Sequence, residues 1–233
     1  MNADMLLLGL VWYVVFLFST TCHEAAHALV AKLGGDLTAA QGGQVSLDPI
    51  PHIRREPFGM VVFPIMSFAM GGWMMGWASA PYNPQWAMQY PRRAAWMSLA
   101  GPAANLTLVI LAGIGIRIGI FTGALQAPQS IGFTHLVVAA EPGALEAVAT
   151  LLSVGFSLNL LLGVFNLLPL PPMDGFGAVG LLLPESGARA FQNFGMRIRS
   201  YSMLGLLLAW WIFNPIFSPI FSLALSALYL GHG

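Results

Sequence analysis

The chain has 233 residues, of which 57% are hydrophobic and only 8% are charged, and its mean hydropathy is +0.75. A soluble domain carries about 25% charged residues, so this composition excludes a chain that covers its whole surface with water-facing side chains. Nine basic and nine acidic residues cancel and form no basic run, which argues against nucleic acid as a partner. We therefore expect residues 1–233 to form a single integral membrane domain.

Apolar segments of about 20 residues, long enough to cross a bilayer, recur along the chain. They cover Met5–Leu33, Phe58–Ala78, Ala94–Ile116, Val148–Leu170 and Tyr201–Leu230. The second segment is broken by Pro64 and by Gly71-Gly72, and the last is interrupted at Asn214-Pro215. The predicted fold class is an all-α polytopic membrane protein with about four to six membrane segments.

Two loops carry weaker signals. Residues 38–48 contain the Gly42-Gly43 turn and a short β-like piece at Gln44–Leu47. Residues 121–147 are mixed and contain Gly and Pro, which predicts a loop with room for an amphipathic helix. The β-like piece, or the glycine-bearing segment 58–78, is a candidate edge strand that could pair with a bound peptide.

The basic residues predict the topology, because Lys and Arg near membrane ends accumulate on the cytoplasmic side. With the N-terminus outside and residues 58–78 entering and leaving the membrane on one side, every basic residue except Arg117 lies inside. If that segment crosses fully, Arg92 and Arg93 move outside. We therefore expect a re-entrant or broken segment at 58–78, which needs surrounding protein or a watery cavity.

The sequence HEAAH, residues 23–27, lies inside the first apolar segment. On a helix, His23 and His27 are four residues apart and lie on one face, where they can bind the same zinc ion, and Glu24 can reach a zinc-bound water as general base. Ionisable groups within a membrane segment are rare and are functional by default. Two histidines leave a catalytic zinc one protein ligand short, since two histidines, one carboxylate and a water form a complete set.

Asp174 is the best candidate for the third ligand. The prolines within 169–172 exclude a regular helix just before it, so the backbone is bent there. An aspartate at such a point either caps the helix that follows or binds metal. In the re-entrant topology the preceding apolar segment ends at the inner side, at the depth of His23 and His27, which favours the ligand. We expect one Zn²⁺ per chain.

These motifs together resemble the site-2 proteases, a family of intramembrane zinc metalloproteases. HEAAHALVAKLGG resembles the family's H-E-x-x-H helix with its glycine pair, and FNLLPLPPMDG resembles its N-x-x-P-x-P-x-x-D-G signature. LAGPAANL is similar to its G-P-x-x-N segment. The resemblance covers most of residues 5–180, and it is closest to the short bacterial and archaeal members that lack an inserted PDZ domain.

The resemblance implies that the three candidate ligands His23, His27 and Asp174 bind zinc and that Glu24 is the catalytic base and acid. It also implies that Asn166 helps to hold the tetrahedral intermediate or the substrate backbone, with a packing amide as the alternative. Asn105 is explained equally well by a buried hydrogen bond between helices.

We expect an intramembrane zinc metalloprotease that hydrolyses peptide bonds within or near the transmembrane segments of membrane protein substrates, in regulated intramembrane proteolysis. Its partners are the lipid bilayer and a substrate transmembrane helix. Its expected location is a prokaryotic cell membrane, with the N-terminus outside and the active site toward the cytoplasmic half. The sequence leaves the oligomeric state open.

The alternative is a non-proteolytic zinc-binding membrane protein, either a transporter or a scaffold. Transporters usually show inverted repeats, and structural zinc sites are closed by four protein ligands. The sequence contains no evident repeat and offers three good ligands, which favours the protease.

Overall fold

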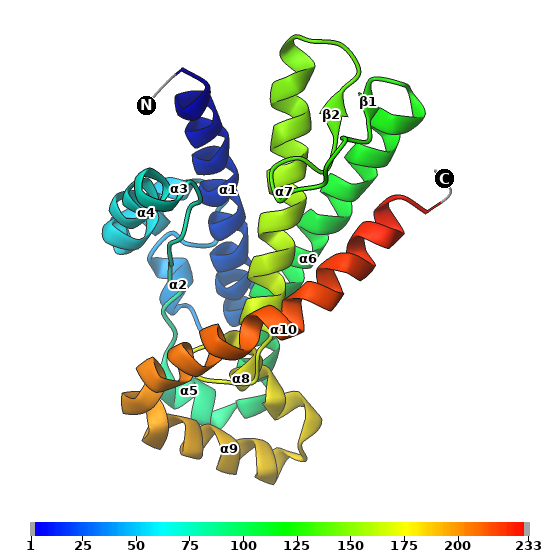
Figure 1. The fold of residues 1–233 in the computed structure, drawn as a ribbon. Coiled ribbons are helices and arrows are strands. Elements are labelled where there is room, and N and C mark those ends of the chain that lie inside the picture. Colours follow the sequence, from blue (N-terminus) through cyan, green and yellow to red (C-terminus); the bar gives the residue numbers. More distant parts are fainter. Residues whose placement is uncertain (1–2, 231–233) are drawn as a thin grey trace.

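The computed structural model describes residues 3–230, which form a bundle of helices with one small sheet (Figure 1). The elements are α1 (Ala3–Leu33), α2 (Thr38–Gln41), α3 (Pro49–Arg55), the π-helical turn η1 (Phe58–Val62), α4 (Phe63–Gly71), α5 (Pro84–Gln89), α6 (Pro91–Phe121), β1 (Leu125–Gln126), β2 (Val138–Ala139), α7 (Ala144–Asn166), α8 (Asp174–Ala178), the 3₁₀ turn η2 (Val179–Leu182), α9 (Glu185–Ile198), the 3₁₀ turn η3 (Arg199–Tyr201) and α10 (Ser202–Leu228). The described residues include four stretches long and apolar enough to cross a membrane: α1, α6, α7 and the segment from α9 through α10. The predicted all-α polytopic fold is confirmed.

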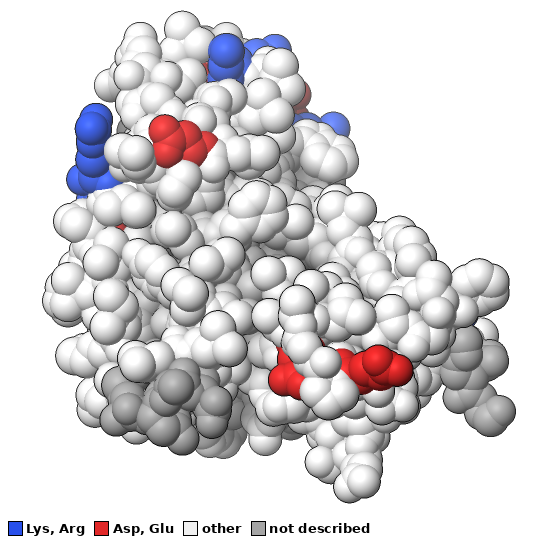
Figure 2. Space-filling model, turned by 90° about the horizontal axis from the view of Figure 1, so that it is seen from above, with Lys and Arg blue, Asp and Glu red and all other residues white. Residues whose placement is uncertain are grey.

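The outer surface is largely apolar. Leu10 on α1, Ile110 on α6 and Trp211 on α10 are each more than half exposed, as are many other large apolar side chains. The face seen in Figure 2 is mostly uncharged and carries only small groups of charged residues. Such a surface fits contact with lipid rather than with water.

The centre of the molecule is formed by α1, α6 and α7, which pack against one another (Figure 1). Trp12 and Phe16 of α1 lie in one buried cluster with Val154 and Leu158 of α7. Toward the end that carries the N-terminus, α6 and α7 diverge from α1 (Figure 1). The three helices are therefore held together most closely in the part that contains the C-terminal half of α1.

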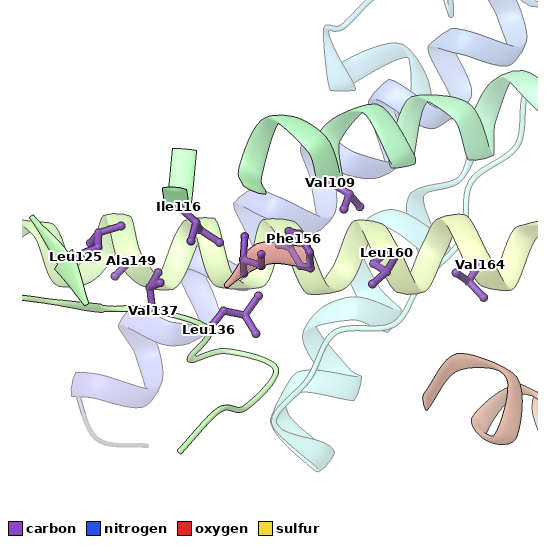
Figure 3. Close-up of a cluster of buried hydrophobic side chains, with 10 residues drawn as sticks. Val109, Ile116, Leu125, Leu136, Val137, Ala149, Phe156, Leu160 and Val164 are labelled. Atoms are coloured by element: carbon purple, nitrogen blue, oxygen red, sulfur yellow. The ribbon is translucent and has the colours of Figure 1, made fainter. Parts of the chain in front are cut away.

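A second apolar cluster fills the space between α6, α7 and residues 122–140 (Figure 3). Ile116 of α6, Leu136 of the connecting segment and Phe156 of α7 are buried in it. The C-terminal end of α10 covers this cluster, and the Arg117 guanidinium donates hydrogen bonds to the carbonyls of Ala227, Leu228 and Leu230. A cation at a helix C-terminus pairs with carbonyls that have no partner within the helix.

Residues 58–78 turn back on themselves, as predicted. Together η1 has five residues and α4 has nine. At a rise of about 1.5 Å per residue, this helical length is too short to cross a hydrocarbon layer of about 30 Å. Gly72, with φ 73°, ends α4, and the chain returns without regular structure. The Trp77 N–H donates to the Gly59 carbonyl at 3.2 Å, which brings the two ends together. A Cβ at Gly59 or Gly76 would overlap the opposing backbone.

Of the two loop predictions, the β-like piece is wrong and the loop is confirmed. The β-like piece expected within 38–48 is not a strand: α2 and a turn at Gly43 (φ 76°) occupy this region, and the buried Gln44 donates its side-chain amide to the Ser79 carbonyl at 2.9 Å. Residues 122–143 form the expected loop, which within the described residues contains no helix but carries the short antiparallel strands β1 and β2. Strand pairing depends on a distant partner, which loop composition does not reveal.

The structure corrects the end of one predicted segment and shows that another is a continuous helix. Helix α7 stops at Asn166 rather than at Leu170, and residues 167–173 form turns before α8. Helix α10 continues through Pro215 and Pro219 as one helix, so the last apolar segment is not a hairpin. Proline weakens a helix but does not end it where the flanking hydrogen bonds persist.

Hydrogen bonds connect the C-terminal end of α1 to α5 and α6. Trp86 and Arg93 both donate to the Gly34 carbonyl, each at 3.0 Å. The buried Asp36 carboxylate accepts a hydrogen bond from the Asn83 N–H at 2.7 Å. These contacts hold the last turns of α1 in place against the neighbouring helices.

Candidate metal centre

Helix α1 carries His23, Glu24 and His27 in its C-terminal third, and their exposed fractions are only 7%, 6% and 5%. The four-residue spacing places the two imidazoles one turn apart, with ring centroids 4.6 Å from each other in an edge-to-face arrangement. Ala28 and Ala31 are fully buried on the same helix. Ala31 packs against Trp86 of α5 and Met97 of α6, and its small side chain lets these helices approach α1 closely.

Asp174, the first residue of α8, joins the two histidines. Its Oδ2 lies 3.0 Å from Nε2 of His23 and 3.3 Å from Nε2 of His27. The carboxylate therefore faces α1 rather than capping α8, whose N-cap is Met173. The next residue, Gly175, is needed for this placement, because a Cβ there would overlap the backbone at the end of α7.

The three atoms form a nearly regular triangle, since the two Nε2 atoms are themselves 3.0 Å apart. Ligand atoms of a tetrahedral zinc lie roughly 3.3 Å from one another, because the bonds are about 2.0–2.1 Å long. The observed separations of 3.0–3.3 Å fit a single ion with one position left for a water or a substrate oxygen.

The other nitrogen of each ring faces an oxygen. Nδ1 of His27 lies 2.7 Å from the Met97 carbonyl, and Nδ1 of His23 lies 2.5 Å from Oδ1 of Asn105. A carbonyl oxygen only accepts, so the proton of neutral His27 lies on Nδ1 and Nε2 keeps its lone pair. Lone pairs of imidazole and carboxylate thus converge on one point, an arrangement that a cation stabilises.

Space for that ion is left by Gly101 of α6. A Cβ at Gly101 would overlap the Nε2 atoms of both His23 and His27. The neighbouring Pro102, fully buried, has no N–H to donate to the carbonyl four residues earlier in α6. The donor set, the triangle and the missing Cβ together fit a divalent zinc ion.

Glu24 completes the group. Glu24 follows His23 directly in the helix, and as a whole residue it is only 6% exposed. The side chain of Asp174 is 22% exposed, so the group is not closed off completely on that side. The arrangement can bind a metal ion and move a proton beside it.

The structure brings together four of the residues predicted to form the site: His23, Glu24, His27 and Asp174. It does not join Asn166 to them: the half-buried Asn166 amide donates to the Leu162 carbonyl of its own helix at 3.1 Å. Within the described residues no hydrogen bond links Asn166 to the three ligands.

Asn105 contacts His23 directly, and it also donates to Oδ1 of Asn159 at 2.9 Å. Asn159 and Ser19, which no sequence motif indicated, continue the same hydrogen-bond network from Asn105. The available signal was a polar amide inside the apolar sequence LNLLLG, which alone does not show what it faces.

Fold and site define an integral membrane protein with a candidate catalytic metal centre of two histidines and one aspartate. The model of Peptidase family M50 matches residues 11–210, a range that contains all of these ligands. The chain belongs to this family, the site-2 protease family. Residues 3–230 hold the membrane helices and short connections without an inserted soluble domain, as expected for the short form.

Three relatives are similar over most of the chain. It is 34% identical over 178 residues to "Putative zinc metalloprotease YwhC" of Bacillus subtilis (strain 168), which covers 76% of this chain and 70% of the relative. It is 29% identical over 205 residues to "Putative zinc metalloprotease Rip2" of Mycolicibacterium smegmatis and of Mycobacterium tuberculosis (strain ATCC 25618 / H37Rv), over 87% of this chain and 70% of each relative. No solved structure matches the chain.

Proposed function

We propose that this protein is an intramembrane zinc metalloprotease that hydrolyses peptide bonds within or near transmembrane segments of other membrane proteins. The observation that carries the proposal is the triangle of His23, His27 and Asp174 next to the residue Glu24, inside a bundle of apolar helices. Membership of a peptidase family and the names of the relatives support it.

Each residue of the group has a role in this proposal. His23 and His27 offer Nε2 and Asp174 offers Oδ2 as ligands. When bound, zinc supplies Lewis acidity, which lowers the pKa of a water to about 7 and polarises a peptide carbonyl. The Glu24 carboxylate accepts the proton of the attacking water and passes it to the leaving amine nitrogen. The partly exposed Asp174 marks the side from which water enters.

Asn166 is proposed to contact the substrate. Its amide belongs to the last turn of α7, and a single hydrogen bond to the Leu162 carbonyl occupies it. An amide that is half-buried and so weakly held can rotate toward a peptide backbone or a developing oxyanion. The role in packing remains the alternative for this residue.

The proposed location is a prokaryotic cell membrane, with the N-terminus outside and the centre toward the cytoplasm. Lys32 in the last turn of α1 lies near Arg93, which contacts the Gly34 carbonyl, at the end of the bundle next to the metal centre. Arg117 lies near the other end of α6. The end richer in basic residues faces the cytoplasm. The proposed partners are a substrate transmembrane helix and the lipid bilayer.

Glu24→Gln tests the reaction. The amide has the same shape but cannot take a proton, so we expect zinc content to be retained and cleavage to fall by at least about a hundredfold, the lower part of the range for general base catalysis. Cleavage is measured on fluorescently labelled single-span membrane peptides reconstituted with the purified chain, and zinc by elemental analysis.

Glu146→Gln is the matched control, because Glu146 caps the N-terminus of α7 and plays no part in the proposed reaction. It should cleave as the wild type does. Cleavage by Glu24→Gln at the wild-type rate with zinc bound would contradict the protease. Zinc binding without cleavage in any variant, the wild type included, would favour the scaffold or transporter instead.

A further inference from the structure

We propose that Asn159 is a positioning residue that acts through Asn105 to hold His23 in the tautomer and orientation that bind metal through Nε2. The proposal rests on the proposed zinc site. Nδ1 of His23 contacts Oδ1 of Asn105 at 2.5 Å, and Nδ2 of Asn105 donates to Oδ1 of Asn159 at 2.9 Å. Nδ2 of Asn159 in turn donates to Oγ of Ser19 at 2.8 Å. This chain of hydrogen bonds, the amide relay, joins α6 and α7 to α1.

A backbone carbonyl determines the direction of the amide relay. Nδ2 of Asn159 also donates to the Gly155 carbonyl at 2.8 Å. Because that oxygen only accepts, the amide nitrogen of Asn159 faces it and the amide oxygen faces Asn105. Asn105 must then present its nitrogen to Asn159 and its oxygen to His23. The His23 proton therefore lies on Nδ1, and the Nε2 lone pair is left for the ion.

Burial makes this direction costly to reverse. Asn105, Asn159 and Ser19 have exposed fractions of 0%, 2% and 1%. Turning either amide over would place two donors or two acceptors face to face, and a buried polar group without a hydrogen-bond partner is destabilising. The amide relay consequently has one favourable arrangement, in which His23 is ready to bind metal.

The comparison with His27 shows why His23 needs the relay. His27 donates to the Met97 carbonyl, which belongs to the backbone and offers only an acceptor. His23 is held by a side-chain amide, which by itself can turn either its oxygen or its nitrogen toward the ring. Asn159 removes this ambiguity, so its role goes beyond holding two helices together.

Asn159→Leu tests the relay, because leucine is similar in size but cannot accept a hydrogen bond from Asn105. We expect the Zn²⁺ affinity of the purified full chain, measured by competition with a chelator, to fall about 10–100-fold. The d–d absorption of the Co²⁺-loaded chain should also change, since the His23 ring loses its single orientation. Unchanged zinc affinity with an unchanged cobalt spectrum would overturn the proposal.

Ser153→Ala is the matched control. Ser153 is also buried on α7, and its hydroxyl oxygen accepts from the N–H groups of Leu136 and Val137, outside the amide relay. Its replacement should lower the midpoint of thermal unfolding and leave zinc affinity unchanged. If Asn159→Leu does not fold, Asn159→Ala removes the same acceptor without adding bulk, and the same fall in affinity is expected.

Asn105→Asp separates positioning from packing. Either oxygen of a carboxylate accepts the Nδ1 proton of His23, so the aspartate does not depend on Asn159 for its orientation. In the Asn105→Asp background, Asn159→Leu should therefore lower zinc affinity much less than in the wild type. An equal loss in both backgrounds would mean that Asn159 acts only through packing, and the proposal would fail.

His23→Ala distinguishes failure of the relay from failure of the proposed function. If the wild type binds Zn²⁺ no more tightly than His23→Ala, the metal centre itself is wrong. If His23→Ala loses zinc while Asn159→Leu keeps it, the centre stands and the amide relay alone is refuted.

Discussion

Helices α7 and α10 are both long and apolar, yet α7 lies at the centre of the molecule and α10 at its periphery. In the most apolar stretch of α7, 50% of the residues are buried, whereas in the segment that contains α10 the share is 6%. Helix α7 also buries polar side chains, namely Ser153, Ser157 and Asn159, while the buried residues of α10 are Ala209 and Leu228.

The difference shows that hydropathy alone does not tell a central helix from a peripheral one in a membrane. Lipid tails are as apolar as leucine, so an apolar face gains little from leaving lipid for protein. Polar groups do gain, because a bilayer offers them no hydrogen bonds. The helices with polar side chains therefore meet at the centre, where the candidate metal ligands lie.

Among the variants that test the contrast between central and peripheral helices, Gly101→Ala on the central helix α6 should have the largest effect. The new Cβ would overlap both Nε2 atoms and fill the place of the ion. Loss of a hydrogen-bond partner of a metal ligand lowers metal affinity roughly 10–100-fold. Gly101→Ala should lower the zinc affinity by more than this. Chelator competition measures it.

Gly113→Ala serves as the control for that variant. It lies on the same helix, and its Cβ would meet only side chains, the Phe156 ring at 3.3 Å and Leu228 at 3.7 Å. Zinc affinity should be unchanged there. Retention of wild-type affinity by Gly101→Ala would show that the ion does not lie between the two imidazoles.

A matched pair of leucines tests the comparison of α7 with α10 directly. Leu158 on α7 is 3% exposed and packs in a buried cluster, whereas Leu207 on α10 is 61% exposed. Leu158→Ala should lower the free energy of unfolding by about 2–3 kcal/mol because a cavity remains. Leu207→Ala should change it by less than about 0.5 kcal/mol.

Unfolding by SDS titration in mixed micelles measures both variants under one condition. Equal losses would mean that α10 is packed against something as closely as α7 is, and the contrast between the two helices would disappear. A second copy of the chain on α10 would produce that result.

The smallest expected effect concerns the loop that ends α1. Burial raises the pKa of Asp36, but hydrogen bonds from Thr38 and Asn83 lower it by more, so this pKa lies below its ordinary value. The stabilisation is therefore complete above the unfolded pKa of about 3.9 and is lost as the pH falls through the folded pKa.

Asp36→Asn should lower the free energy of unfolding at pH 7 by about 1–2 kcal/mol. The amide nitrogen would face the N–H of Asn83 or Thr38, so that two donors meet and a hydrogen bond is lost. The loss of stability between pH 5 and more acidic conditions should be smaller than in the wild type. Asp48→Asn is the control, since asparagine caps α3 as well as aspartate does. If the free energy of unfolding of Asp36→Asn depends on pH as that of the wild type does, Asp36 is not the cause of the acid dependence.

Much of the candidate site followed from local patterns. The spacing of His23 and His27 predicts one helix face, and the prolines before Asp174 predict a bent backbone, because helix periodicity and proline geometry depend on neighbours in the sequence. Basic residues predicted that 58–78 turns back, and the hydrogen bond from Trp77 to Gly59 agrees with it. The metal ligand roles themselves stay predictions until metal is measured.

Other features depend on partners far away in the chain. The strand pair at Leu125–Gln126 and Val138–Ala139 was missed and a strand-like piece at Gln44–Leu47 was wrongly expected, since two short strands exist only where they meet. The amphipathic α9 was not predicted, and the continuity of α10 through its prolines was left open.

The sequence by itself determined that the chain has the composition of a membrane protein, which residues are candidate metal ligands, and the family to which it belongs. These follow from composition and from short motifs. Only the tertiary structure decided that Gly101 leaves room at the two imidazoles and that Asn159 orients Asn105 toward His23. The reason is physical: a hydrogen bond between residues 54 or 82 positions apart exists only when packing brings their helices together.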